Sequence, residues 1–202
     1  MKAEHIGHTP FPLAVLSGVF NPNEISWLKA EMGFLSSKLQ TEEHTGSATN
    51  DNGELLKKTM GVFVDDVYYN RDSSRILNIN RKIFNEVIPY LASRSSGWFF
   101  DNIQLTKDHT LVAYYEEEDY YKAHSDTSLL TAITWVYEEP KRFKGGDLIF
   151  PDHDLTVSVE NNTTVIFPGC IPHQVSEVSM LDSKDKGKGL GRYAMIQFGN
   201  IT

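Results

Sequence analysis

Two histidines and an aspartate have the types and the spacing to hold one metal ion. His124 and Asp126 flank a serine in the run His124-Ser125-Asp126. Alternate side chains of an extended segment point to the same side, so these two can bind one ion together. His173, which follows 47 residues after Asp126, is the best candidate for a third ligand. Two histidines and one carboxylate form the facial triad of non-haem iron(II) sites, which leaves coordination positions open for reactants.

Arg192 is the second candidate for chemistry, because it begins an otherwise apolar segment that runs to Phe198. An arginine at the start of a strand is commonly exposed to solvent. Its planar guanidinium can also hold a carboxylate through two hydrogen bonds. A dicarboxylate bound to a metal at one end would need such a partner at the other end.

Other residues that resemble a metal site have simpler explanations. Asp152-His153-Asp154 follows a proline, and this pattern predicts a polar turn. Cys170 is the only cysteine, and we expect a small packing residue rather than a ligand. Residues 116–119, Glu-Glu-Glu-Asp, form a charge run. Such a run predicts a solvated loop, or alternatively an acidic border to a substrate entrance.

The composition fits one globular domain of ordinary polarity. The chain has 202 residues, of which 40% are hydrophobic, and a formal net charge of −8. This charge disfavours nucleic-acid partners. With one cysteine no internal disulfide can form, which suits a reducing compartment, and we expect the protein in the cytoplasm. Pro10 and Pro12 interrupt the first residues, so we expect neither a signal peptide nor a membrane partner. The composition does not decide the oligomeric state.

Two helical stripes are the clearest pattern in the first half of the chain. Asn21 can cap a first helix, with Pro22 at its first position and Glu24 three residues after the cap. Its apolar positions are Ile25, Leu28, Met32, Leu35 and Leu39. A second helix is predicted after Ser73, and Pro89 should weaken its end. Its apolar positions are Ile76, Ile79, Ile83, Val87 and Tyr90.

Short strands separated by turns are predicted for most of the remaining chain. A mobile loop over residues 41–56 should lead into a strand at 60–64. From position 98 onward, strands are expected at 103–105, 110–115, 129–137, 147–150, 156–159, 163–167, 174–178 and 192–199. Many short strands after two helices favour a sandwich or barrel with the helices packed on one outer face. We therefore predict a mainly β (α+β) fold in one domain over residues 1–202.

Four motifs in this order resemble the prolyl 4-hydroxylase-like branch of the 2-oxoglutarate/iron(II)-dependent dioxygenases. They are Tyr115 nine residues before His124-x-Asp126, Gly145-Gly146-Asp147-Leu148, Pro172-His173, and Arg192-Tyr193-Ala194. The resemblance covers residues 103–198 strongly and the N-terminal half loosely. Nucleic-acid dealkylating relatives carry a second arginine where this chain has Phe198, and plant-type small-molecule oxygenases carry a serine where it has Ala194.

The resemblance implies a fold and a role for each site residue. The fold would be a double-stranded β-helix (jelly-roll) core over residues 98–202, supported by helices and strands of residues 1–97 that pack on one sheet. His124, Asp126 and His173 would bind Fe(II), and Arg192 would bind the C5 carboxylate of the co-substrate 2-oxoglutarate. Tyr115 would lie near 2-oxoglutarate or serve as a core aromatic residue. Trp135 takes the place of a tyrosine that contacts the same carboxylate in some relatives, but an indole offers only one donor.

The resemblance also implies an activity, with alternatives left open. The enzyme would hydroxylate an unactivated C–H bond, with release of succinate and CO2 and with ascorbate as a candidate reductant. The first choice of substrate is a prolyl residue of a peptide or protein. The alternatives are a free amino acid or other small molecule, a cupin-like metal-binding jelly roll that does not use 2-oxoglutarate, and a non-catalytic ligand-binding module.

The chain departs from the family pattern in two places. Glu118 stands where the family has a glycine, and Arg192 follows His173 by 19 residues, a longer interval than usual in the family. We expect residues 179–191 to form a long hairpin loop that absorbs this difference. Residues 41–59, which include Lys57 and Lys58, are expected to be either a lid over the substrate or an ordinary surface loop.

Overall fold

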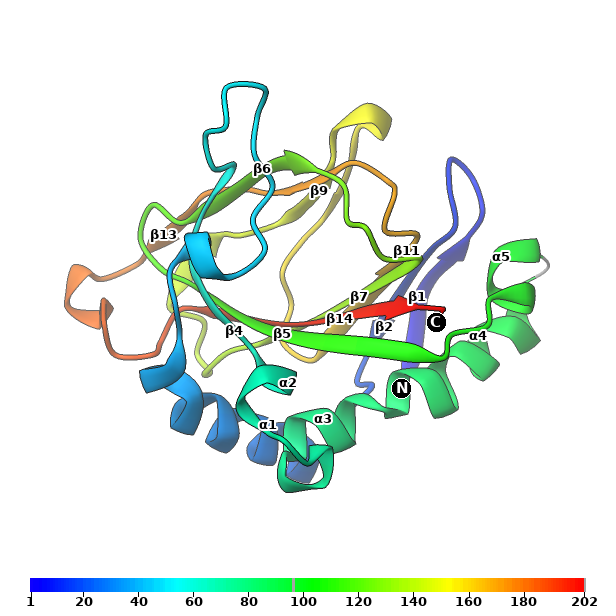
Figure 1. Ribbon diagram of the computed structural model, residues 1–202, viewed down its shortest axis with the longest axis horizontal. Coiled ribbons are helices and arrows are strands. Elements are labelled where there is room, and N and C mark those ends of the chain that lie inside the picture. The colour runs from blue at the N-terminus through cyan, green and yellow to red at the C-terminus, as the bar shows by residue number, and fades with distance from the viewer. Residues whose placement is uncertain (96, 202) are drawn as a thin grey trace.

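The computed structural model describes residues 1–95 and 97–201, and its core consists of two antiparallel sheets that face each other (Figure 1). The major sheet has the strand order β1 (Lys2–Gly7), β2 (Leu13–Ser17), β11 (Thr163–Phe167), β7 (Leu130–Val136), β14 (Arg192–Asn200), β5 (Lys107–Tyr115) and β4 (Met60–Phe63). The minor sheet has the order β10 (Leu155–Val157), β9 (Leu148–Phe150), β12 (His173–Val175), β6 (Tyr120–His124) and β3 (Lys57–Lys58). A separate pair joins β8 (Phe143–Gly145) to β13 (Val178–Met180).

From β5 onward the chain alternates between the two sheets. It passes from β5 in the major sheet to β6 in the minor sheet, then to β7, to β9 and β10, to β11, to β12 and finally to β14. This alternation defines a double-stranded β-helix, so the predicted jelly-roll core is confirmed. It also places β6 and β12 side by side, although they are far apart in the sequence.

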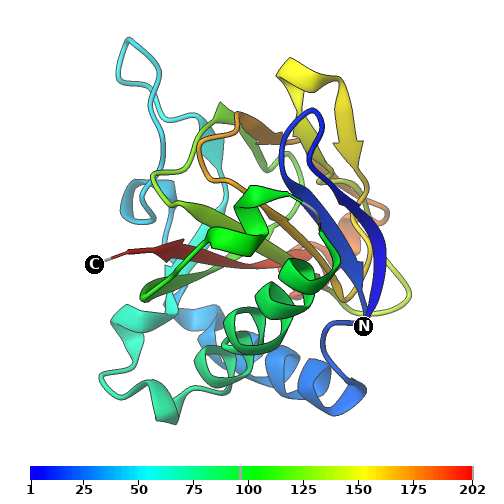
Figure 2. The same cartoon turned by 90° about the vertical axis from the view of Figure 1, so that its right-hand side faces the viewer.

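Helices cover the outer face of the major sheet. These are α1 (Pro22–Leu35), α2 (Val64–Val67), α3 (Arg75–Asn80), α4 (Ile88–Arg94) and α5 (Trp98–Asn102). Figures 1 and 2 show α1, α3 and α4 running beneath the sheet. Because strand residues alternate, Val112 of β5 and Met195 of β14 point toward the helices and pack with Leu28 and Leu35 of α1. The prediction that helices pack on one sheet is therefore confirmed.

The opposite face of the same strands looks into the space between the sheets. Leu111 of β5, Ile133 of β7 and Ala194 of β14 pack there with Leu148 and Phe150 of the minor sheet. Tyr115, Trp135 and Arg192 have the same parity in these strands, so strand geometry turns them inward as well.

The first predicted helix is confirmed, and the second differs from its prediction. Asn21 caps α1 by accepting from the backbone N–H of Glu24, whose side chain accepts in turn from the backbone N–H of Asn21. The second helix is divided into α3, a π-helical turn at Ile83–Val87, and α4. Pro89 lies in the first turn of α4, where its missing N–H costs little, so the helix continues to Arg94.

Most predicted strands are present, but two of the expected strands are wrong and one hairpin was missed. Residues 103–105 form no strand, because Ile103 and Leu105 pack instead against the helical side of the core. The segment expected at 174–178 is divided between β12 and β13, which belong to different sheets. The hairpin β1–β2 was not predicted, because its first strand is half-exposed and lacks a regular apolar pattern.

Across the described ranges, none of the helices combines the length and apolar character that a membrane crossing requires.

Candidate active site

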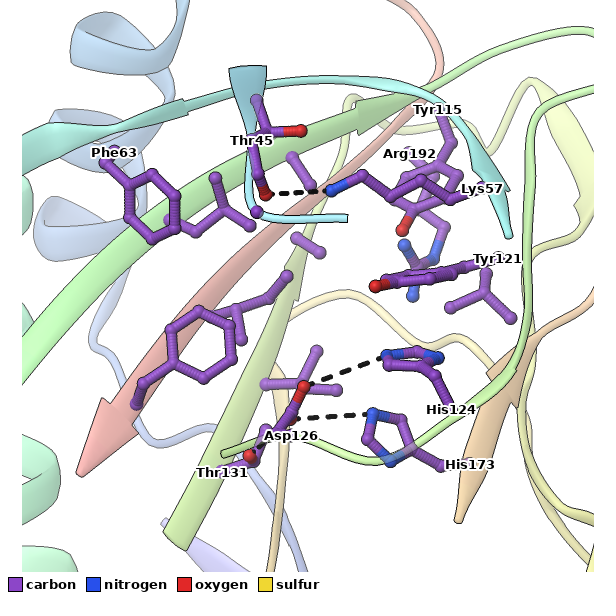
Figure 3. Close-up of a pocket in the computed structure, with 18 residues that line it drawn as sticks. Thr45, Lys57, Phe63, Tyr115, Tyr121, His124, Asp126, Thr131, His173 and Arg192 are labelled. Carbon is purple, nitrogen blue, oxygen red and sulfur yellow. Dashed lines mark hydrogen bonds and ion pairs between the residues drawn. The ribbon is translucent and has the colours of Figure 1, made fainter. Parts of the chain in front are cut away.

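Neighbouring strands bring the three candidate metal ligands together. His124 ends β6, His173 begins β12, and the two stand directly opposite each other in the strand register. Asp126 lies just beyond β6. Its Oδ1 is 3.8 Å from Nε2 of His124, and its Oδ2 is 3.6 Å from Nε2 of His173. The ligand atoms all lie within 4.8 Å of one another, and no other such group of histidine, cysteine and acidic residues occurs within the described ranges (Figure 3).

Hydrogen bonds orient both imidazoles so that Nε2 of each ring faces the space between the three ligands. Nδ1 of His124 lies 2.9 Å from the carbonyl oxygen of Lys122, and Nδ1 of His173 lies 2.9 Å from that of Ile171. A carbonyl oxygen can only accept, so each Nδ1 carries a proton and each Nε2 of a neutral ring presents its lone pair. Burial lowers the pKa of His124 to about 3, and the charge of His173 acts in the same direction. At neutral pH His124 is therefore neutral and able to bind a metal.

The carboxylate of Asp126 is held in place by its neighbours. Oγ1 of Thr131 donates to Oδ2 at 2.5 Å, and the backbone N–H of Asp126 donates to the carbonyl oxygen of Gly169 at 2.8 Å. Burial raises the pKa of this carboxyl, while His173 acts to lower it. Two imidazole lone pairs and a carboxylate thus converge with no donor between them, and a cation is the group that satisfies all three.

Replacing Thr131 by valine should weaken iron binding about tenfold, the lower end of the range found for such supporting residues. Valine keeps the shape of threonine but cannot donate to Asp126, so the carboxylate loses its fixed orientation. Competition between the protein and a coloured iron(II) chelator measures this affinity. Thr134→Val is the matched control, because Thr134 lies on the same strand and bonds to Thr164 on the opposite face. Equal affinities for the two variants would contradict the role given to Thr131.

Arg192 is buried in the same pocket as the triad, and no ion pair joins it to an acidic side chain among the residues that the structure describes. Its side chain is 1% exposed, and its guanidinium lies 4.7 Å from the ring centroid of Tyr115, its partner in the strand register. Nε and Nη1 have no hydrogen-bond partner within residues 1–95 and 97–201. Burial lowers the pKa of Arg192 to about 10, which still leaves it charged at neutral pH. A buried charge with unsatisfied donors is costly, so this guanidinium is suited to an incoming anion.

The triad and Arg192 line one pocket between the two sheets. Its other polar lining residues include Lys57, Tyr115 and Tyr121. The remaining walls are mostly apolar and comprise Phe63, Leu111, Ala113, Ile133, Val175, Ala194, Ile196 and Phe198. Metal ligands at one position and a cation at another can hold the two ends of a small dicarboxylate.

The two aromatic candidates lie in different places. Tyr115 lines the pocket and is almost fully buried, so it is both a core aromatic residue and a wall of the site. Trp135 is fully buried 5.8 Å from the guanidinium of Arg192, but it is not among the lining residues. Its Nε1 has no hydrogen-bond partner in the described part of the chain. Their contact with 2-oxoglutarate stays a prediction.

Two residues of the site were not predicted. Tyr121 stacks on the ring of His124, with centroids 3.5 Å apart and an interplanar angle of 12°. No pattern in the sequence marks this contact. Thr131 did carry a signal, because a hydroxyl inside a wholly buried strand needs a partner.

The rival residues lie outside the triad. His153 lies in a 3₁₀ turn, as expected, with its ring 4.8 Å from that of Phe11. Cys170 is exposed, so the expectation of a packing residue is wrong. It sits in the tight turn before His173, where its carbonyl oxygen accepts from Ser125.

The two departures from the family pattern are accommodated by turns. Glu118 has a φ of +65°, a conformation that glycine adopts readily, so the turn before β6 is kept with a glutamate in it. After β13 ends at Met180, the chain forms a 3₁₀ turn at Ser183–Asp185 and returns to Arg192. The loop expected at residues 179–191 is therefore present from residue 181 onward, but it does not close a hairpin, because β13 pairs with β8 and not with β14.

Residues of the 41–59 segment border the pocket. Thr45, Gly46 and Lys57 are among its lining residues. The segment is attached to β6, because the backbone N–H of Ala48 donates to the hydroxyl of Tyr121 at 2.9 Å. Its movement as a lid stays a prediction.

Gly146→Ala should displace Arg192 and raise the 2-oxoglutarate requirement about tenfold, equivalent to losing one hydrogen bond to a charged group. Gly146 has a φ of +74°, and a Cβ there would lie 2.6 Å from Cδ of Arg192. Gly187→Ala is the control, since Gly187 has a φ of +76° but nothing within 4 Å of its Cβ position. Both variants should lose about 1 kcal/mol of stability from backbone strain. The interpretation fails if both have the same apparent KM for 2-oxoglutarate.

Comparison with known proteins shows which solved structures share this fold. No protein-family model matches the sequence, and no curated protein matches it significantly. A prolyl-4-hydroxylase from Pseudomonas putida is similar in structure, with a TM-score of 0.56 and 14% identity over 94% of this chain and 92% of that one. The viral collagen prolyl hydroxylase of Paramecium bursaria Chlorella virus-1 has a TM-score of 0.56 and 13% identity, covering 94% and 96% of the two chains.

The fold likeness does not separate the branches of this group. The structure of OsALKBH1 has a TM-score of 0.57 and 14% identity, covering 92% of this chain and 97% of that one. The chain thus has the fold of prolyl 4-hydroxylases and other 2-oxoglutarate/iron(II) oxygenases. At these identities the likeness concerns the fold, and the activity rests on the site.

Proposed function

We propose that this protein is an iron(II)- and 2-oxoglutarate-dependent dioxygenase that hydroxylates an unactivated C–H bond. The observation that carries the proposal is the pairing, in one pocket, of a His-Asp-His triad with a buried arginine that has unpaired donors. The triad alone would also suit a cupin-like metal site, and the jelly roll alone would suit a ligand-binding module. Neither alternative explains a buried guanidinium in the same pocket with two nitrogens that lack a partner among the described residues.

Each residue would have a distinct part in this reaction. His124, Asp126 and His173 would hold iron, and Arg192 would hold the C5 carboxylate of 2-oxoglutarate. When bound, iron and 2-oxoglutarate supply oxygen activation, which converts a C–H bond and dioxygen to C–OH while 2-oxoglutarate becomes succinate and CO2. Thr131 orients the carboxylate of Asp126 by its hydrogen bond. The apolar walls keep bulk water from the site.

A prolyl residue of a peptide or protein is the proposed substrate, with a free amino acid as the alternative. A groove adjoins the pocket at Tyr121, Asp126 and Phe198 and gives a chain-like substrate a path to the triad. Polar residues along this groove, such as Ser47, His109 and Asn200, can bond to a peptide backbone. Ascorbate would act as the reductant, and the reaction would take place in the cytoplasm.

Turnover tests this function in two stages. Succinate formed from 2-oxoglutarate in the presence of iron(II) and oxygen, without any added substrate, tests the oxygenase class. Mass detection of one added oxygen atom in a panel of proline-containing peptides and free amino acids then tests the substrate. No succinate from protein loaded with iron would refute the oxygenase assignment, while succinate without any oxidised prolyl peptide would refute only the substrate.

A further inference from the structure

A lysine ammonium projects into the same pocket and has no place in the assignments above. Lys57 forms the short strand β3, paired with Tyr121 of β6, and the whole residue is only 5% exposed. Its ammonium lies 5.2 Å from the centroid of the Tyr121 ring, whose plane stacks in turn on His124. Figure 3 shows Lys57 and His124 flanking the ring of Tyr121.

The ammonium of Lys57 is incompletely satisfied. It donates to the carbonyl oxygen of Thr45 at 3.0 Å, the one acceptor that it reaches among the residues described. Glu42 and Asp126 are the acidic groups whose charges act on it, but no ion pair joins either of them to Lys57 within the described ranges. An ammonium has three N–H donors, so donors remain for a ligand in the pocket.

The charges of the filled site leave a role for this lysine. Among the groups that line the pocket or would fill it, iron(II), Arg192 and Lys57 carry four positive charges, whereas Asp126 and the dianion 2-oxoglutarate carry three negative ones; Glu42, whose charge also acts on Lys57, does not line the pocket. In a pocket with low dielectric an unbalanced charge favours an anionic partner. In the proposed function Arg192 would bind one carboxylate of the co-substrate, and the metal held by the triad would bind its other end. The excess positive charge is therefore available to the second substrate.

We propose that Lys57 is a specificity-determining residue that binds a carboxylate of the substrate to be hydroxylated. This inference rests on the proposed function and names its substrate class. The carboxylate is either the α-carboxylate of a free amino acid or the C-terminal carboxylate of a peptide. In both cases the ammonium orients the substrate across the face of Tyr121, next to the metal ligand His124.

Protection of Lys57 from acylation tests binding without relying on turnover. Protein with iron(II) and saturating 2-oxoglutarate is treated, without oxygen, with a small N-hydroxysuccinimidyl ester, and peptide mass spectrometry follows the acylation of each lysine. The pKa of about 8, which burial gives Lys57, makes its amine reactive near that pH. N-acetyl-L-proline should slow acylation of Lys57 about tenfold, whereas N-acetyl-L-prolinamide should not. Lys58 is the internal control, because it is exposed and pairs with Glu118.

Three results would overturn the proposal. These are full protection of Lys57 by 2-oxoglutarate alone, equal protection by acid and amide, and protection by neither. The first would assign Lys57 to the co-substrate, the second would show that the substrate charge is not recognised, and the third would show that no carboxylate binds there.

Kinetics then separate a binding role from a structural one. The panel contains L-proline and a peptide with C-terminal proline, each as the free acid and as the amide. For the member turned over fastest, Lys57→Met should raise the apparent KM of the acid about tenfold and bring it close to that of the amide. The readout is the ratio of the KM of the acid to the KM of the amide, and Lys58→Met should leave this ratio unchanged.

A purely structural lysine would affect acid and amide equally, and that result would contradict the proposal. Failure of the oxygenase assignment itself is distinguishable, because succinate formation without substrate would then be absent from the unmodified protein. The preferred acid also identifies the origin of the bound carboxylate. Preference for L-proline indicates a free amino acid, and preference for the peptide indicates a C-terminal carboxylate.

Discussion

His173→Ala is expected to lose stoichiometric iron(II) binding. The affinity should fall at least about a hundredfold, because the loss of a residue that only supports a metal ligand can already cost that much. The histidine supplies one of three converging lone-pair groups, and its Nε2 lies 3.6 Å from the carboxylate of Asp126. Anaerobic titration with iron(II) measures the loss, and succinate formation should fall with it. Iron should also cease to raise the unfolding temperature of the variant.

His153→Ala is the matched control for this prediction. His153 lies between two aspartates in the sequence, which superficially resembles a metal site, but the structure places it in a turn against Phe11. Iron affinity should therefore be unchanged in this variant. If His173→Ala retained stoichiometric iron while His153→Ala lost it, the ligand assignment would be wrong.

Arg192→Met is expected to raise the apparent KM for 2-oxoglutarate about a hundredfold. Two hydrogen bonds to a charged carboxylate contribute about 3 kcal/mol together, and each 1.4 kcal/mol corresponds to a factor of ten. Arg192→Lys keeps the charge but loses the planar pair of donors, so about a tenfold rise is expected. Initial rates of succinate formation at varied 2-oxoglutarate measure both effects.

Arg192→Met should weaken the binding of 2-oxoglutarate, but it should not destabilise the protein without ligands. Arg192 is buried with two unpaired nitrogens, and methionine fills similar space without a charge to desolvate. The free energy of unfolding without ligands should therefore rise or stay unchanged in Arg192→Met. A strongly destabilised variant whose KM for 2-oxoglutarate is normal would indicate a structural arginine and remove it from the site.

Local patterns were sufficient to predict the parts of the fold that depend on local chemistry. The cap at Asn21 and strands such as β11 depend on residue types within a few positions, and both are present. Elements that depend on partners far along the chain were harder to predict. Residues 103–105 have strand-like composition but form no strand, because Ile103 and Leu105 pack against the helical side of the core, and β1 gains its place only by pairing with β2.

The site shows the same division between local and long-range information. The two-residue spacing of His124 and Asp126 follows from strand geometry, whereas the meeting with His173 depends on β6 and β12 becoming neighbours in the jelly roll. The importance of Lys57 could not be inferred from the sequence, because a lysine in a polar segment is ordinarily exposed. Only its pairing beside Tyr121 buries the side chain in the pocket.

The central claim is that the triad and Arg192 bind iron(II) and 2-oxoglutarate in one site. The most direct test is to add 2-oxoglutarate to the iron-loaded protein without oxygen and to measure its visible absorption. A 2-oxo acid that chelates iron(II) gives a weak charge-transfer band, so its appearance reports metal and co-substrate in one site. We expect the band in the unmodified protein, its loss in His173→Ala, and a need for about a hundredfold more 2-oxoglutarate in Arg192→Met. Absence of the band at saturating 2-oxoglutarate, or a band of full strength in His173→Ala, would contradict the assignment.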